Sequence, residues 1–203
     1  MSTTLNEIVE LLEKCGYPFG RHEYDQTPVV LVKTSHYLNS EQQPVLSVFI
    51  QVIEEGRIVK FFCPAAYHIP LDTTGFAALK TFASISWKVR LVNFQVDIED
   101  GEVRPSIHIP VEDTSLTPQQ LQACLENLSV VVDLFDPYIR HALIYGEVHD
   151  RILTGDALSL LQESIDALDD SDDSDVDISS EESEPESEES SSDDSENPDD
   201  EWM

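Results

Sequence analysis

The sequence predicts a folded domain of the α+β class followed by an acidic tail. Apolar residues recur first at helical and then at strand spacing, in the order helix, three strands, helix, hairpin, helix. Charge is distributed unevenly: of 41 Asp and Glu residues, 19 lie in residues 166–203, which contain none of the 11 Lys and Arg residues. So charged a segment cannot bury enough apolar surface to fold. We therefore expect residues 169–203 to be a disordered Ser/Asp/Glu-rich tail.

The first element is a short amphipathic helix. Thr4 and Glu7 are spaced as a capping box, in which each side chain accepts a hydrogen bond from the other residue's backbone N–H. Gly16 is suited to a left-handed end, and Pro18 prevents continuation. The apolar stripe between these signals consists of Leu5, Ile8, Val9, Leu11 and Leu12.

Three strands are expected next, at residues 29–32, 45–53 and 58–63. A turn at Glu55-Gly56 would place Val52 opposite Val59, so that alternate residues of the last two strands form one apolar face. The opposite face is also too apolar for a surface that only meets water, so either a partner or a third helix of the chain would cover it. Its large apolar residues are the candidate protein-binding residues: Phe49, Ile53, Ile58 and Phe62.

A second helix and a second hairpin follow. Asp72 is the expected cap of a helix over residues 73–86, whose core stripe would be Phe76, Leu79, Phe82 and Ala83. Asp100-Gly101 is typical of a two-residue type I′ turn. Such a turn would set Val96 opposite Pro105 and Asp97 opposite Arg104.

The last helix of the body begins at Thr117, where Pro118 and Gln120 complete the start signals. Pro137 lacks an N–H group, so we expect it to interrupt this helix, with a further helical segment over residues 138–153. Residues 154–168 would then form a separate short amphipathic helix. Its apolar stripe is Leu158, Leu161, Ile165 and Leu168.

Catalytic and metal motifs are absent from the sequence. It contains no Cys-x-x-Cys pair, no Gly-x-Ser-x-Gly elbow and no glycine-rich phosphate loop. Cys63 and His68 are five residues apart with no third ligand nearby. An enzyme would require His68, His108 and Asp97 to meet in a cleft. We therefore expect no enzyme activity, no metal and no cofactor.

Charge and composition also limit the partners and the compartment. Residues 1–165 hold 22 acids against 11 bases, so even the body would repel nucleic acid. No apolar run is long enough to span a membrane. Three widely separated cysteines, Cys15, Cys63 and Cys124, suit a reducing compartment. These features predict a cytoplasmic protein.

Two motifs carry a resemblance to a known family. The hairpin run Asp97-Ile98-Glu99-Asp100-Gly101-Glu102-Val103 and the helix start Leu116-Thr117-Pro118-Gln119-Gln120-Leu121 resemble those of the YbjN-like proteins, which share the fold of the type III secretion chaperones. The resemblance implies an antiparallel five-stranded sheet with helices on one side, over residues 1–153. It also implies a homodimer that binds an extended or partly unfolded protein segment.

Two functional hypotheses follow. In the first, the chain is a non-enzymatic chaperone-like or adaptor protein that holds a client protein through its apolar sheet face or a dimer surface. In the second, it is a regulatory or signalling protein whose acidic tail docks on a basic partner, with Trp202 as an aromatic anchor. A tail that only improves solubility, binds divalent cations or is phosphorylated remains an alternative.

Overall fold

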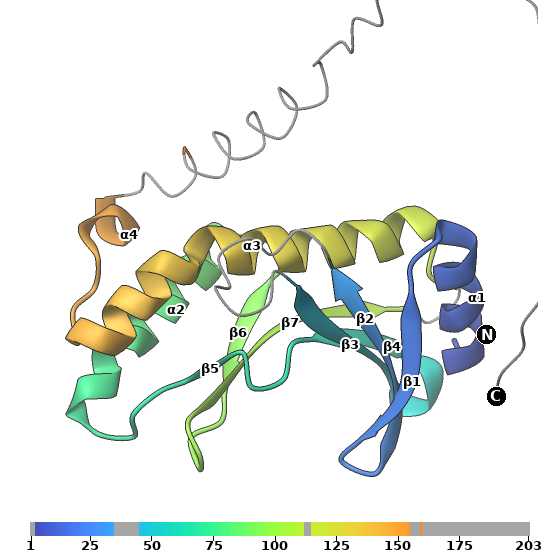
Figure 1. Cartoon of the computed structure of the whole chain (residues 1–203), viewed down its shortest axis with the longest axis horizontal. Helices are drawn as coiled ribbons and strands as arrows, with labels where there is room; N and C mark the ends of the chain where they lie inside the picture. The colour runs from blue at the N-terminus through green and yellow to red at the C-terminus, as the bar shows by residue number, and fades with distance from the viewer. Residues whose placement is uncertain (1–2, 35–44, 112–114, 155–158, 160–203) are drawn as a thin grey trace, which may run out of the picture.

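The computed structural model describes residues 3–34, 45–111, 115–154 and 159. They form a mixed α+β fold in which helices lie on one side of a seven-stranded antiparallel sheet (Figure 1). The α-helices are α1 Leu5–Cys15, α2 Phe76–Lys88, α3 Pro118–Tyr145 and α4 Asp150–Thr154. The strands are β1 Phe19–Tyr24, β2 Thr27–Thr34, β3 Leu46–Ile53, β4 Ile58–Phe62, β5 Tyr67–His68, β6 Asn93–Val96 and β7 Glu102–Pro110.

The long strand β7 organises one end of the sheet. From the other end, the strands follow the order β1, β2, β3, β4 and β7. Val103 pairs with both Tyr67 of β5 and Val96 of β6, so these two strands must lie along opposite edges of β7. By the same argument, Ser106 separates β4 from β6. Strands β4 and β5 therefore follow each other along one edge of β7.

The expected count of five strands is wrong, because β1 and β5 were missed. The β1–β2 turn is Asp25-Gln26, and both residues have positive φ (48° and 61°) although neither is glycine, so the usual hairpin signal is absent. Strand β5 has only two residues, and it follows Pro64. Only its pairing with β7 identifies it as a strand.

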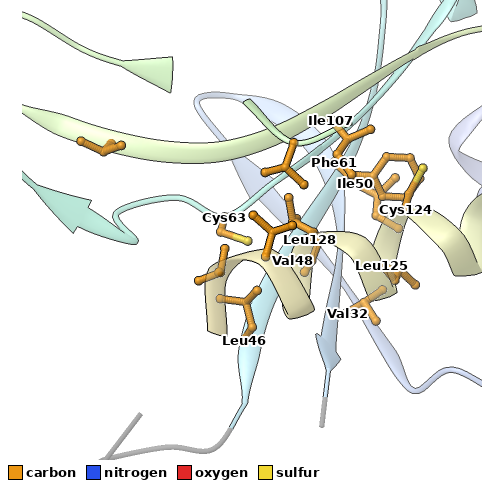
Figure 2. Packing of buried hydrophobic residues seen from close by; sticks show 14 of the residues in the cluster. Val32, Leu46, Val48, Ile50, Phe61, Cys63, Ile107, Cys124, Leu125 and Leu128 are labelled. Atoms are coloured by element: carbon orange, nitrogen blue, oxygen red, sulfur yellow. The ribbon is translucent and has the colours of Figure 1, made fainter. Parts of the chain in front are cut away.

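The main core lies between the sheet and the helices. Figure 2 shows side chains from β2, β3, β4, β7 and α3 pointing toward one another. The predicted register of the β3–β4 hairpin is confirmed, with Val52 opposite Val59 and Ile50 opposite Phe61. The predicted core face is confirmed in its fully buried members Val48, Ile50, Val59 and Phe61.

The first helix is confirmed, but the core stripe of the second is wrong. The capping box at Thr4 is present, with its N–H donating to Glu7 Oε2 at 2.7 Å, and Gly16 ends α1 with φ of 75°. In α2, Phe82 is the one predicted core residue that is buried. Phe76, Leu79 and Ala83 are exposed instead. The buried side of α2 consists of Ala77, Ala78, Thr81, Phe82 and Ile85.

The predicted register of the β6–β7 hairpin is shifted by two residues. Val96 lies opposite Val103, and Gln95 opposite Arg104. A two-residue turn does not form because Asp97 closes a longer loop: its carbonyl accepts the N–H of Gly101 at 2.9 Å. A shift of two keeps the paired residues on their predicted faces. Ile98, predicted to point to the core, instead lies in the loop and is 81% exposed.

Helix α3 runs through Pro137, so the expected interruption is wrong. The Asp136 side chain, 2% exposed, accepts hydrogen bonds from Tyr67 Oη at 3.0 Å and from Arg140 Nε at 2.6 Å. The second bond links residues on either side of the proline. Pro137 is exposed, so the lost backbone bond lies on the side where helices open toward water. Packing of the helix therefore outweighs the local preference.

The continuous part of the described chain ends at α4. Gly146, with φ of 68°, ends α3, and α4 follows after a short loop. Of the predicted amphipathic helix over residues 154–168, only Thr154 and Ser159 are among the described residues. The tail over residues 169–203, including Trp202, lies outside them. Within the described part of the chain, no helix is long and apolar enough to cross a membrane.

Candidate functional site

The two faces of the sheet differ in what covers them. Helices α1, α2 and α3 contact strands from one side, where the core residues point. Side chains of paired residues share a face, so Phe49 and Phe62, which pair across β3 and β4, point the opposite way from Ile50 and Phe61. Among the described residues, no helix lies over this second face (Figure 1). We call it the outer face.

Four aromatic rings from three strands meet on the outer face and form the outer-face cluster: His22, Tyr24, Phe49 and Phe62. The Phe49 and Phe62 rings pack edge-on, with centroids 5.7 Å apart. The Tyr24 ring contacts both, at 5.5 Å from Phe49 and 5.2 Å from Phe62. The His22 ring stacks on Phe49 at 6.5 Å. The rings thus form one continuous aromatic surface.

The four rings of the cluster differ in how far they are buried. Phe62 is 1% exposed, yet it is not part of the main core. Phe49 and Tyr24 are half-buried, and His22 is exposed. Phe62 therefore forms the floor of the cluster, while Phe49 and Tyr24 present ring surface to solvent. Of the two predicted binding residues in this cluster, Phe49 is therefore the accessible one.

The other predicted binding residues lie beside this cluster or outside the described residues. Ile53 and Ile58 are both half-buried and pair with each other at the end of the β3–β4 hairpin, opposite Pro110 of β7. They extend the apolar surface toward the hairpin end. Trp202 lies outside the described residues, so the structure does not place it.

Cationic side chains border the cluster. Lys60 Nζ lies 4.5 Å from the Phe62 ring centroid, and the Arg104 guanidinium lies 5.6 Å from that of Tyr24. Burial, followed by the nearby charge of Arg104, lowers the pKa of Lys60. Arg104 also forms an ion pair with Glu102 that holds the pKa of that carboxyl below its usual value. The outer face thus combines aromatic rings with positive charge.

His108, opposite Lys60 on β7, gives the protein a predictable dependence on pH. His108 is partly exposed, and the loss of hydration on its covered side, followed by the charge of Lys60, lowers its pKa. The unfolded chain therefore binds a proton more readily, so the free energy of unfolding should decrease as the pH falls below about 6.5. Replacing His108→Gln should flatten this decrease between pH 7 and 5 in urea titrations. If the free energy of unfolding of His108→Gln falls with pH as steeply as that of the wild type, His108 is not the group responsible. The carboxyl of Glu102, whose pKa is lowered, titrates below this pH range.

The structure does not bring the candidate catalytic residues together. His68 pairs with Glu102 at one end of β7, whereas His108 pairs with Lys60 six residues further along the strand, about 20 Å away. Asp97 lies in the exposed β6–β7 loop, where its carboxylate accepts the N–H of Glu99 at 2.9 Å. A shared cleft for these three side chains is therefore incompatible with the sheet.

Cysteine and histidine side chains have structural surroundings. Burial raises the pKa of the Cys63 thiol and raises that of Cys124 to about 11, so both stay protonated near neutral pH. The His141 and His149 rings do meet, with centroids 5.1 Å apart, next to Tyr138 and Tyr145. Within the described ranges, no group of three His, Cys, Asp or Glu side chains is arranged to hold a metal ion.

Sequence reasoning found half of the outer-face cluster. Phe49 and Phe62 follow from the alternation in two apolar strands. Tyr24 and His22 were missed together with their strand, because Phe19–Tyr24 reads as a polar segment that contains Gly20. Lys60 and Arg104 were visible as outward residues, but only the structure shows that they lie against aromatic rings.

The fold and the site thus define a class of protein: an α+β domain whose aromatic sheet face has no helix over it among the described residues. No protein-family model matches the sequence, and no match to a curated protein was found. In structure, the chain is similar to the crystal structure of YbjN from E. coli, described there as a proposed transcription regulator, with 14% sequence identity and a TM-score of 0.48. The match covers 66% of this chain and 92% of that one. Membership of the YbjN-like proteins stays a prediction.

Proposed function

We propose that the chain is a non-enzymatic protein-binding module, chaperone-like or an adaptor, that holds a client protein on its outer face. The observation that supports this proposal most is the outer-face cluster, whose half-buried rings of Tyr24 and Phe49 have no described helix above them. Amphipathic aromatic surface of this kind is enriched where proteins bind other proteins. Ile53 and Ile58 enlarge the apolar area available to a client.

The free edge of the sheet next to the cluster favours a client that binds as an extended segment. Strand β1 carries His22 and Tyr24 and pairs only with β2 among the described strands. Its other edge presents backbone N–H and C=O groups that a further strand can bind. A client segment paired there would place its side chains beside the outer-face cluster. A second copy of the chain could use the same surface, which would give the homodimer predicted from the sequence.

A charged substitution at Phe49 tests the proposal. The probe is fluorescein-labelled, reduced and carboxymethylated α-lactalbumin, a permanently unfolded acidic protein that the acidic tail would repel. We expect fluorescence anisotropy titrations to show binding by the full chain, and Phe49→Asp to weaken it at least about tenfold, since a charge is introduced into an apolar contact. Phe62→Asp is unsuitable, because Phe62 is buried and its replacement would unfold the protein.

A matched control separates the outer face from apolar surface in general. The control is Ile98→Asp, because Ile98 lies in the β6–β7 loop and is 81% exposed. Like Phe49→Asp, this substitution removes a large apolar side chain and adds one negative charge. We expect this variant to bind the probe as the wild type does. Equal binding by wild type and a folded Phe49→Asp variant would overturn the proposal. Light scattering on the same samples shows whether Phe49→Asp also dissociates a dimer.

The alternative, in which the acidic tail docks on a basic partner, gives a different result. It predicts that poly-lysine binds to the full chain, that Phe49→Asp leaves this binding unchanged, and that the unfolded acidic probe does not bind. Salt would weaken the poly-lysine complex strongly, because it depends on charge alone.

A further inference from the structure

Helix α2 is apolar on two opposite sides. One side packs in the core, with Ala78, Phe82 and Ile85 fully or almost fully buried. The other side exposes large apolar residues at helical spacing: Phe76 is 59% exposed, Leu79 38% and Trp87 90%, with Ala83 between them. These four residues, which we call the outer stripe of α2, span about 80° of the helix surface at about 3.6 residues per turn. A helix with two such faces normally has a partner on each.

The segment that carries the outer stripe is locally basic, although Asp72 lies beside Phe76 and Leu79 at its start. Residues 73–96 contain three bases, Lys80, Lys88 and Arg90, and no acid, in a chain whose net charge is -30. Lys80 Nζ lies 4.7 Å from the Phe76 ring centroid, so charge and apolar surface are adjacent on the stripe. A second copy of α2 would bring like charges together. An apolar and acidic partner is favoured instead.

The chain itself supplies such a segment at the right place. Lys88 Nζ donates to the Ile152 carbonyl at 2.5 Å, which fixes α4 beside the end of α2 near Trp87. Only two residues of α4 follow Ile152, and Gly155 then permits a turn. Thr154, where the continuous described chain ends, therefore lies close to the C-terminal end of α2.

The sequence that follows matches the outer stripe in spacing, length and charge. Leu158, Leu161 and Ile165 recur at helical spacing, as the residues of the outer stripe do. As a helix, residues 157–168 would be about 18 Å long, and the 13 residues of α2 span about 20 Å. Residues 156–170 carry five acids and no base. Each property complements α2.

From this match, we propose that residues 157–168 dock as an amphipathic helix on the outer stripe of α2, antiparallel to it. The contact covers Trp87 and Phe76 with the chain's own apolar residues and sets acids of the segment near Lys80 and Arg90. It anchors the start of the acidic tail to the helical side of the domain, away from the outer face. The docking does not depend on the proposed function, because the two surfaces lie on opposite sides of the sheet.

The fluorescence of Trp87 tests this docking in the full chain. Trp87 becomes the sole tryptophan in the Trp202→Phe background, since the sequence contains two. In this background we expect docked Trp87 to be shielded from the neutral quencher acrylamide. Leu161→Asp with Ile165→Asp should shift its emission to the red and raise its quenching to that of an exposed indole. Ser159→Asp with Ser164→Asp adds the same charges outside the apolar stripe and should change neither property.

Several results would overturn the docking. One is quenching of Trp87 as strong as that of free indole in the Trp202→Phe protein without further substitutions. Another is quenching that does not change when Leu161→Asp and Ile165→Asp are added. Shielding that grows with protein concentration would identify a second copy as the occupant instead. High salt offers a further check, because it should increase quenching if acids and bases meet at the contact.

Discussion

Replacing Phe61→Ala is expected to reduce the free energy of unfolding by about 3–5 kcal/mol, the usual cost of truncating a buried phenylalanine in a core. Phe61 is fully buried on the inner side of β4, between Ile50 of β3 and Ile107 of β7. The cavity would open at the centre of the sheet, where the surrounding strands cannot move in to fill it. Urea unfolding followed by circular dichroism measures the effect.

Phe49→Ala is the matched control on the same hairpin, because its side chain points to the outer face and is half-buried. We expect it to cost about 1 kcal/mol, the typical effect of a substitution outside the core. A cost at Phe49 equal to that at Phe61 would mean that both faces are cores. The outer face would then have no surface to offer a client.

Gly101→Ala is expected to destabilise the protein by about 3 kcal/mol or more, because two effects combine there. Gly101 has φ of 83°, a left-handed conformation that costs an alanine about 1–2 kcal/mol. In addition, a Cβ at this position would lie 2.3 Å from the carbonyl oxygen of Ile69. The Ile69 N–H donates to the Gly101 carbonyl at 2.8 Å, so relieving the clash separates β5 from the β6–β7 loop.

Gly146→Ala isolates the conformational part of this cost. Gly146 has a similar φ of 68°, but a Cβ there would meet no atom within 4 Å. Gly146→Ala should therefore reduce the free energy of unfolding only by the cost of a left-handed alanine. Its urea midpoint should lie well above that of Gly101→Ala. Equal midpoints would show that β5 does not hold the loop in solution.

The fold could be predicted where local signals and burial agree. The capping boxes at Thr4 and Thr117 depend only on residues three positions apart, and the structure contains both. Strand β1 instead forms by pairing with β2. Because the turn between these strands contains no glycine, the sequence does not indicate that pairing. Proline usually interrupts a helix, yet packing and the hydrogen bonds of Asp136 keep α3 continuous through Pro137. Such tertiary effects are not encoded in a short stretch of sequence.

The candidate site shows the same division. Alternation in β3 and β4 predicted an apolar second face, but it could not reveal that Phe62 is covered by its neighbours. That depends on Tyr24, which comes from a strand almost forty residues away. Three residues of the outer stripe of α2, Phe76, Leu79 and Ala83, are predicted from the sequence to face the core, because a helix that is apolar on both sides gives no preference for either face.

The most direct measurement of the central claim is photo-crosslinking from position 49. The full chain would carry the photoreactive residue p-benzoylphenylalanine in place of Phe49, and in a control protein in place of the exposed Ile98. After irradiation with the unfolded α-lactalbumin probe, we expect crosslinks from position 49 to the probe or to a second copy of the chain, and few from position 98. Equal crosslinking from both positions, or none from position 49 while the probe is bound, would contradict a binding surface on the outer face.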